Sequence, residues 1–356
     1  MMVGRSQLKK QGAWKMRIIL YAKAAMWFLL AASTAAWGQL QPIPKESGFS
    51  GFVNAGVLYV DVESNLIAGN DVVDVGDKVI TSLTSSPRSS DDVTPMLNFD
   101  LRYTFASTRT QLFVGNSLED FIRLDLTSQA GVRQGLSDRS SVSASLVFSS
   151  VPTEVWADPY VVNVPRRKTD TDTKGIRLNW DRILDSNFTL QYTYRDIDLD
   201  KEQSGLTQLG LPRAQASLLD RNGDHHRAEV IYRWQVAPRH TLLPAYRYEK
   251  FDLDGDAMAN DQHTLQITYA YRGDRFSVAL NAEYVNAEYD AVNPIYGKTR
   301  DQDGYGGALQ LFWHGPFGAP KDLSLLGTVA AYESDANIAF YDASVFASGV
   351  SLFYRF

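Results

Sequence analysis

The chain has no cysteine, and only 5 of its 356 residues are histidine. Without cysteine, no disulfide framework can staple the fold in an oxidising compartment, and no lipid can be attached through an N-terminal cysteine. A catalytic or metal site built on histidine would have to draw on His225, His226, His240, His263 and His314. The stability of the fold must therefore come from packing and hydrogen bonding.

Long apolar runs are missing beyond the N-terminus. A membrane-spanning helix needs about 18 or more apolar residues. The only comparable stretch, Ala24 to Trp37, follows six basic residues, the last of them Lys23, and precedes the first acidic one, Glu46. This order is typical of a secretory signal peptide, and Ala36-Trp37-Gly38 offers small residues for cleavage. We expect residues 1–38 to be a cleaved signal peptide, with Met16 as an alternative start and a membrane anchor as the alternative interpretation.

An excess of positive charge is also missing. Cleavage after Gly38 takes 6 of the 35 basic side chains away, which leaves 29 against 41 acidic ones and a formal charge of about −12. Because nucleic-acid phosphates require a basic face, this balance argues against nucleic acid as a partner.

What the mature chain does have is alternation of apolar and polar side chains over segments of about ten residues. Alternation places the two kinds on opposite faces of a strand, and in a transmembrane barrel the apolar face meets lipid. The final segment shows it best: one face carries Phe346, Val350, Leu352, Tyr354 and Phe356. An alternating segment that closes on an aromatic residue resembles the signal by which the barrel-insertion machinery recognises its substrates.

The segments predict an all-β fold, a transmembrane antiparallel up-and-down β-barrel of about 14 strands, with 12 or 16 as alternatives. Short connections at 106–109, 184–187, 237–239 and 273–274 alternate with long polar ones at 65–93, 152–172, 200–225 and 290–303. Short periplasmic turns and long external loops alternate in this way in bacterial outer-membrane barrels. We expect a short periplasmic segment over 39–50, a barrel over 51–356, and a location in the outer membrane of a Gram-negative bacterium.

Aromatic residues recur at matching strand ends. Phe105, Trp180, Trp234 and Trp313 fall where strands should reach the periplasmic interface, and Tyr59, Tyr194, Tyr246, Tyr248, Tyr284 and Tyr305 fit a belt at the outer rim. Such girdles mark membrane–water interfaces. The expected partners are outer-membrane lipid, lipopolysaccharide and the barrel-insertion machinery.

Alternation also predicts which charged side chains point into the lumen. The pore-lining candidates are Asp100, Arg102, Arg123, Asp125, Arg177, Asp181, Arg195, Glu229, Arg233, Arg247, Glu249, Arg275 and Glu283. The lumen of a 14-strand barrel is too wide for side chains alone to fill. These charges either select solutes, as charged rings do in pores, or pair across strands and brace the wall. An external loop such as 65–93 or 200–225 could also close the pore.

Three short segments resemble a known family. These are Pro42-Ile43-Pro44-Lys45-Glu46-Ser47-Gly48-Phe49-Ser50-Gly51, Asn65-Leu66-Ile67-Ala68-Gly69-Asn70, and the terminal Phe353-Tyr354-Arg355-Phe356. Together they resemble the proteobacterial domain of unknown function 2860, whose members look like secreted outer-membrane proteins of similar length. The resemblance implies a barrel and brings no catalytic residues.

The sequence has few motifs that would indicate catalysis or the binding of a cofactor or metal. No Gly-x-Ser-x-Gly elbow, zinc helix or phosphate-binding loop is present, and we expect no enzyme activity, no cofactor and no metal. His225 and His226, beside Asp224, are expected in a solvated external loop. Asp252 to Asp256 reads as an acidic external turn, with divalent binding as an alternative, although Ala257 and His263 depart from the calcium-loop pattern.

These observations favour a passive or weakly selective channel for small hydrophilic solutes. The alternative is a plugged structural or surface-interaction barrel without transport. A hydrophobic-substrate transporter suits the strand number but would carry a sizeable N-terminal plug, and only about a dozen residues, 39–50, precede the first expected strand. A barrel enzyme is the fourth hypothesis.

Overall fold

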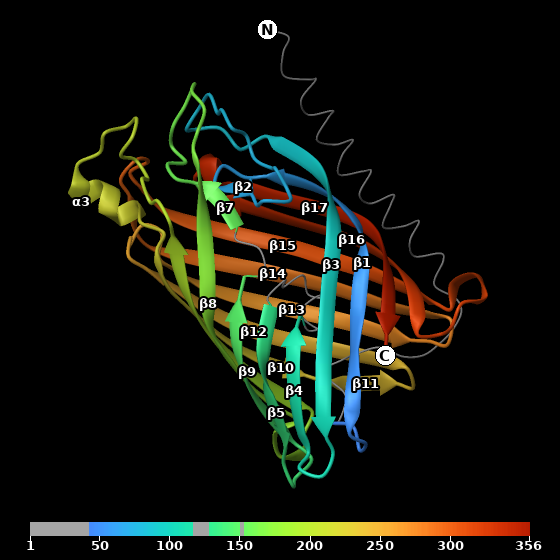
Figure 1. Cartoon of the computed structure of the whole chain (residues 1–356). Helices are drawn as coiled ribbons and strands as arrows, with labels where there is room; N and C mark the ends of the chain where they lie inside the picture. Colours follow the sequence, from blue (N-terminus) through green and yellow to red (C-terminus); the bar gives the residue numbers. More distant parts are fainter. Residues whose placement is uncertain (1–42, 117–127, 150–152) are drawn as a thin grey trace.

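The computed structural model describes residues 43–116, 128–149 and 153–356, and within them 14 antiparallel strands close into a barrel (Figure 1). The predicted signal peptide, 1–38, lies outside the described residues. The first strand pairs with the last in a continuous register from Phe52 opposite Arg355 to Glu63 opposite Ser344, so the sheet has no free edge. The predicted fold class and strand number are confirmed.

The ring is formed by β1 (Gly48–Glu63), β3 (Ser89–Phe105), β4 (Thr110–Gly115), β5 (Ser128–Gly135), β6 (Ser141–Phe148), β8 (Lys168–Asp181), β9 (Phe188–Leu199), β10 (Gly223–Tyr232), β12 (His240–Leu253), β13 (Asn260–Arg272), β14 (Phe276–Asn293), β15 (Lys298–His314), β16 (Leu323–Ala336) and β17 (Ala343–Arg355). The short β11 (Trp234–Ala237) continues β10 along β12, and β2 (Ile67–Gly69) and β7 (Thr153–Trp156) lie in long connections. Helical turns are confined to connections: η1 (Ile183–Asp185), α3 (Arg213–Ala216), η2 (Ser217–Leu219), η3 (Pro316–Gly318) and η4 (Ala339–Tyr341). No helix in the described ranges is long and apolar enough to span a bilayer.

Burial follows the alternation that the sequence shows. On β3 the outward Leu97 is 71% exposed while the adjacent Asn98 is 6% exposed, and on β13 Leu265 and Gln266 differ in the same way. The outer surface is therefore apolar and the inward surface largely polar. This is the reverse of a soluble barrel, whose apolar side chains fill the inside.

The connections differ sharply between the two ends of the barrel. At one end, here the turn end, all of them are short: 106–109, 136–140, 182–187, 238–239, 273–275 and 315–322. At the other, the loop end, 64–88, 149–167 and 200–222 are long, whereas 254–259, 294–297 and 337–342 are short. The predicted long loop at 290–303 is wrong, since β14 and β15 pair to Asn293 and Lys298 and leave a four-residue turn. Polar residues read as a loop there, but strand ends that rise above a bilayer face water and need no apolar side.

One other boundary differs from the sequence prediction. The first strand begins at Gly48, three residues before the predicted start of the barrel at Gly51. Residues 117–127, between β4 and β5, lie outside the described residues.

Two apolar clusters lie inside the molecule. The lumen cluster, on inward positions near the turn end, consists of Phe52, Ile231, Leu243, Ala245, Ala270, Ala279, Phe312, Leu326 and Phe353. The loop core, at the loop end, consists of Ile80, Tyr160, Leu219, Ala257, Met258, Ile338, Phe340 and Tyr341. Neither cluster was predicted, because alternation assigns apolar side chains to the lipid face.

Candidate functional site

Most of the predicted pore-lining residues occupy inward positions of the ring. The strand alternation places on the inward face Asp100, Arg102, Arg177, Asp181, Arg195, Glu229, Arg247, Glu249 and Glu283. Arg233 sits between β10 and β11. Arg275 lies exposed in the turn before β14, with its guanidinium 5.9 Å from the Phe276 ring, so it is at the rim rather than in the wall. Arg123 and Asp125 lie outside the described residues.

Near the turn end, ion pairs connect one arc of the wall. Arg102 Nη2 lies 2.5 Å from Asp100 Oδ2 on the same strand. Arg133 reaches from β5 across β6 to Asp181 on β8, with 3.4 Å between Nη2 and Oδ2, and its Nε donates to Ser141 Oγ at 2.9 Å. These side chains are nearly buried, so they stiffen the wall while they line it.

A second set of charges lies toward the loop end, on β10 and β12. The register places Glu229 opposite Arg247 and Arg227 opposite Glu249. Arg227 Nε donates to Glu249 Oε1 at 3.0 Å, and Arg247 lies 3.5 Å from Glu229 and 3.6 Å from Glu249. Opposite charges therefore face each other across the strand pair, as the bracing interpretation requires.

The histidine prediction is wrong in one respect. His225 and His226 lie in β10 and not in a loop. His225 points inward, is 3% exposed, bonds Glu249 Oε1 through Nε2 at 3.1 Å and stacks on Phe251 at 4.2 Å. His226 points outward and contacts the Tyr192 hydroxyl at 2.9 Å. The first residues of β10 are polar on both the inward and the outward face, so their sequence shows no alternation and resembles a loop.

Five inward arginines were missing from the predicted set: Arg133, Arg227, Arg272, Arg300 and Arg355. The signal that could have found them is the same alternation. For example, the parity that turns Ser351 and Phe353 inward also turns Arg355 inward.

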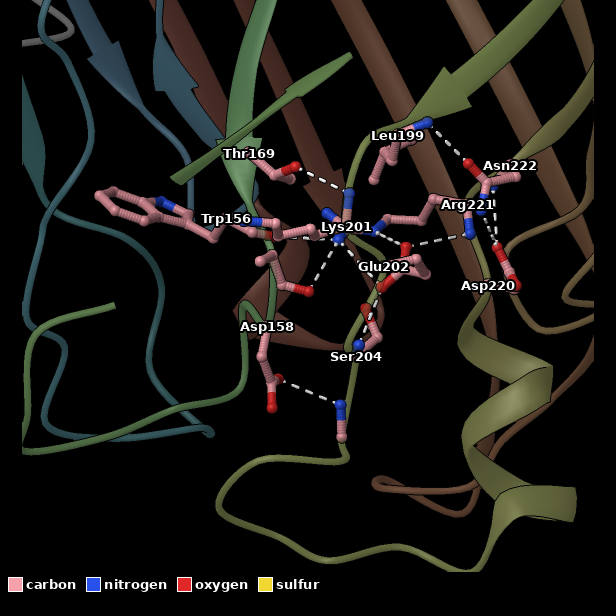
Figure 2. Close-up of polar contacts among 12 residues, drawn as sticks. Trp156, Asp158, Thr169, Leu199, Lys201, Glu202, Ser204, Asp220, Arg221 and Asn222 are labelled. Atoms are coloured by element: carbon pink, nitrogen blue, oxygen red, sulfur yellow. Dashed lines mark hydrogen bonds and ion pairs between the residues drawn. The ribbon is translucent and has the colours of Figure 1, made fainter. Parts of the chain in front are cut away.

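The external connections fold against one another at the loop end. Figure 2 shows Arg221 joining two of them: its Nε donates to Glu202 Oε2 at 2.7 Å and its Nη2 to the Trp156 carbonyl at 2.8 Å. Asp158 accepts from the Gly205 and Thr207 amides, both at 3.0 Å. The segment 153–167 and the connection 200–222 thus form a single unit.

Arg166 is the other centre of this assembly. It is 2% exposed, its Nη1 donates to the carbonyls of Asn65 at 2.7 Å and Pro159 at 3.2 Å, and its Nη2 donates to the Asp77 carbonyl. Its guanidinium lies 4.3 Å from the Trp156 ring, and burial lowers its pKa to about 10. A cavity of about 500 Å³ beside it is lined by Asp158, Val164, Arg167, Gln203 and Gln208 among others.

Tyrosines complete the loop core. The Tyr160 and Tyr341 hydroxyls lie 2.7 Å apart, Asn293 Nδ2 donates to Tyr341 at 2.6 Å, and Arg300 lies 4.1 Å from the Tyr341 ring. Burial raises the pKa of the Tyr160 hydroxyl well above its ordinary value. The core draws on connections from all around the ring, so these side chains can meet only by crossing the mouth of the barrel.

Among the described residues no group of three or more His, Asp or Glu side chains could hold a metal ion. His314 lies 2.8 Å from both Ser277 Oγ and Ser324 Oγ. Both serines are 2% exposed, so neither hydroxyl is open to a substrate.

Solved structures with a similar outline are outer-membrane proteins. A Pseudomonas aeruginosa FadL homologue is 12% identical with a TM-score of 0.43, covering 91% of this chain and 99% of that one. The outer-membrane channel DcaP of Acinetobacter baumannii is 11% identical with a TM-score of 0.42, covering 87% and 97%. The TodX monoaromatic hydrocarbon channel, as a mutant, is 13% identical with a TM-score of 0.45, covering 92% and 96%. Nothing about the solute of this chain follows from similarities of this size.

None of the functionally curated proteins matches the chain. Residues 48–355 match the model of a family described as "Protein of unknown function (DUF2860)". The match spans the whole described barrel and confirms the resemblance seen in the sequence.

Proposed function

We propose that this chain, which belongs to the DUF2860 family of proteins of unknown function, is an outer-membrane channel for small hydrophilic solutes. The observation that supports this proposal most strongly is the closed 14-strand ring with an apolar outer face and a charged inner face. An arginine on the lipid side of such a wall would cost roughly 2–4 kcal/mol at the bilayer midplane. Polar side chains are therefore confined to the inside, where they can line a path for polar solutes.

The aromatic residues support the placement in a membrane. At the turn end, Trp234 is 55% and Phe105 is 41% exposed on the outer face. Toward the loop end, outward tyrosines donate to carboxylates on neighbouring strands: Tyr194 to Asp224, Tyr248 to Asp261, Tyr284 to Asp303 and Tyr305 to Glu333. Rings in lipid with hydroxyls toward water fit an interfacial belt. Lipopolysaccharide and the barrel-insertion machinery are the partners that this placement implies.

The loop core favours a second candidate. Because it crosses the mouth, the barrel can also be a closed structural or surface-interaction protein, as the sequence left open. In the channel hypothesis the same core limits conductance. The two candidates differ in whether current flows when the core is removed.

The experiment compares the wild-type protein with a variant in planar bilayers. Residues 203–220 are replaced by a short Gly-Ser linker, which keeps the Glu202–Arg221 pair as the bridge. The matched control replaces 316–319, at the opposite end of the barrel. We expect larger conductance steps only in the first variant. Silence in both, with protein shown to be folded, would favour the closed barrel.

We also propose that the chain is not an enzyme. His225→Ala and His226→Ala should leave lipase and protease assays at the level of a mock preparation, as for wild type. Activity that disappears with either histidine would contradict this.

A further inference from the structure

We infer that the lumen selects anions, and that its solutes are small carboxylates with an apolar body. The inference rests on the proposed function and names its substrate class. It follows from two arrangements inside the barrel: the balance of charge on the inward face, and the position of the lumen cluster beside the arginines.

The inward face has the opposite sign to the rest of the chain. Its buried and half-buried positions in the described strands carry nine arginines, namely Arg102, Arg133, Arg177, Arg195, Arg227, Arg247, Arg272, Arg300 and Arg355. They carry six acids, namely Asp92, Asp100, Asp181, Glu229, Glu249 and Glu283. Among the described residues the inward face thus has three positive charges in excess, whereas the formal charge of the whole chain is −6. The other carboxylates of the described strands lie outside this face, as Asp224, Asp261, Asp303 and Glu333 do.

The arginines are distributed along the whole path. Arg272 and Arg355 end β13 and β17 at the turn end, Arg247 lies midway along β12, and Arg195 lies in the loop-end half of β9; all four are half-buried. An anion on its way through would meet a partly exposed guanidinium at each level. An excess of one sign of charge along a low-dielectric channel concentrates the opposite ion. The planar fork of arginine also matches a carboxylate with two parallel hydrogen bonds.

The apolar component comes from strands other than those that carry the turn-end ion pairs. The lumen cluster occupies β1, β10 and β12 to β17, whereas the Arg102–Asp100 and Arg133–Asp181 pairs occupy β3, β5 and β8. Phe353 stacks on Phe52 at 4.9 Å and meets Phe312 edge-on at 5.4 Å. These rings pack on one another, so an apolar solute would extend the cluster rather than fill a hole.

Cations lie directly beside these rings. The Arg355 guanidinium is 5.9 Å from the Phe353 ring, and Arg272 occupies the last inward position of β13 at the same end of the barrel. A solute with a carboxylate and an apolar body can meet both features at once. A neutral aromatic molecule would lack the charge contact, and an inorganic anion would lack the apolar one.

The test measures ion selectivity and block in a bilayer, with the 203–220 linker variant and with wild type. In a KCl gradient the reversal potential should show chloride preferred over potassium. Arg195→Gln on β9 should lower that preference roughly twofold, the effect of one charge about 8 Å away in water. Lys174→Gln, on the outward face of the neighbouring strand β8, is the matched control and should leave it unchanged. Benzoate should block chloride current at lower concentration than acetate, and benzylamine should not block.

Selectivity for potassium, or an equal effect of Lys174→Gln, would overturn the anion preference. Equal block by benzoate and acetate would overturn the apolar component. Because a silent barrel gives no current, benzoate binding is also measured by titration calorimetry in detergent, with Arg355→Gln as the comparison. Binding without current would refute the channel and keep the carboxylate site, whereas neither binding nor current would overturn both.

Discussion

Arg166 is the residue whose loss should open the loop core. It contacts three carbonyls from separate parts of two connections, Asn65, Asp77 and Pro159, and it covers the Trp156 ring. In Arg166→Ala all four contacts disappear together. The neighbouring Arg167 is exposed, so Arg167→Ala removes a charge at the same place without breaking the network.

The size of the effect can be worked from these contacts. A buried carbonyl left without a donor costs about 1–3 kcal/mol, and a cation over an aromatic ring contributes about 0.5–2 kcal/mol. The cavity beside Arg166 admits water to part of the network, which places the sum toward the lower end. We expect Arg166→Ala to weaken the loop core by about 3–5 kcal/mol, and Arg167→Ala to stay within about 0.5 kcal/mol.

Hydrogen exchange in detergent micelles measures this directly. The Arg166 amide donates to the Lys78 carbonyl and the Asn163 amide to the Ile80 carbonyl, so both report on the junction of the two connections. A loss of 3–5 kcal/mol corresponds to protection lower by about 10²–10³-fold or more, at 1.4 kcal/mol per tenfold. Amides in β13 to β15 should not change. Unchanged loop protection, or equal loss throughout the strands, would refute the reasoning.

Four further outcomes test other parts of the account. Leu97→Arg places a charge on the outer face and should cost about 2–4 kcal/mol in a urea titration in lipid, whereas Leu97→Met should be near neutral. Phe356→Ala should slow insertion by the barrel-insertion machinery in proteoliposomes, and equal rates would remove Phe356 from the proposed signal. Unboiled protein should migrate anomalously on detergent gels with a β-type circular dichroism spectrum; a helical spectrum would contradict the fold. Hydrogen bonds from Ser140 lower the pKa of Asp138 in a turn-end connection, so Ser140→Ala should raise that pKa in an NMR titration; in the wild type this contribution to the turn is present above the ordinary pKa and is lost as pH falls through the lowered one.

Most of the barrel can be predicted from the sequence, because the alternation of side chains along a strand is a local pattern. Whether Leu97 faces lipid and Asn98 faces the lumen depends only on the two-residue period, and the terminal segment from Phe346 to Phe356 repeats this pattern clearly. Connection length is also local, so the turn at 106–109 was predicted correctly. The loop at 290–303 was not, because a strand that leaves the bilayer loses its apolar face while its backbone stays paired.

What the sequence could not show depends on contacts between distant segments. The loop core joins Ile80, Tyr160 and Phe340, which no periodicity relates. The lumen cluster is hidden for a different reason: Phe312 and Phe353 are inward aromatics that alternate with outward ones, so these stretches read as uniformly apolar. His225 shows the converse, since polar residues on both faces of β10 concealed the first residues of that strand.

The central claim is that the outer face of the barrel meets lipid and the inner face does not. The cysteine-free sequence allows single-cysteine variants to test it in reconstituted bilayers. Leu97→Cys, Leu265→Cys and Val350→Cys, each labelled with a fluorophore, should be quenched strongly by brominated lipid, while Asn98→Cys, Gln266→Cys and Ser351→Cys should not. Equal quenching at both sets, or quenching at neither, would contradict the account.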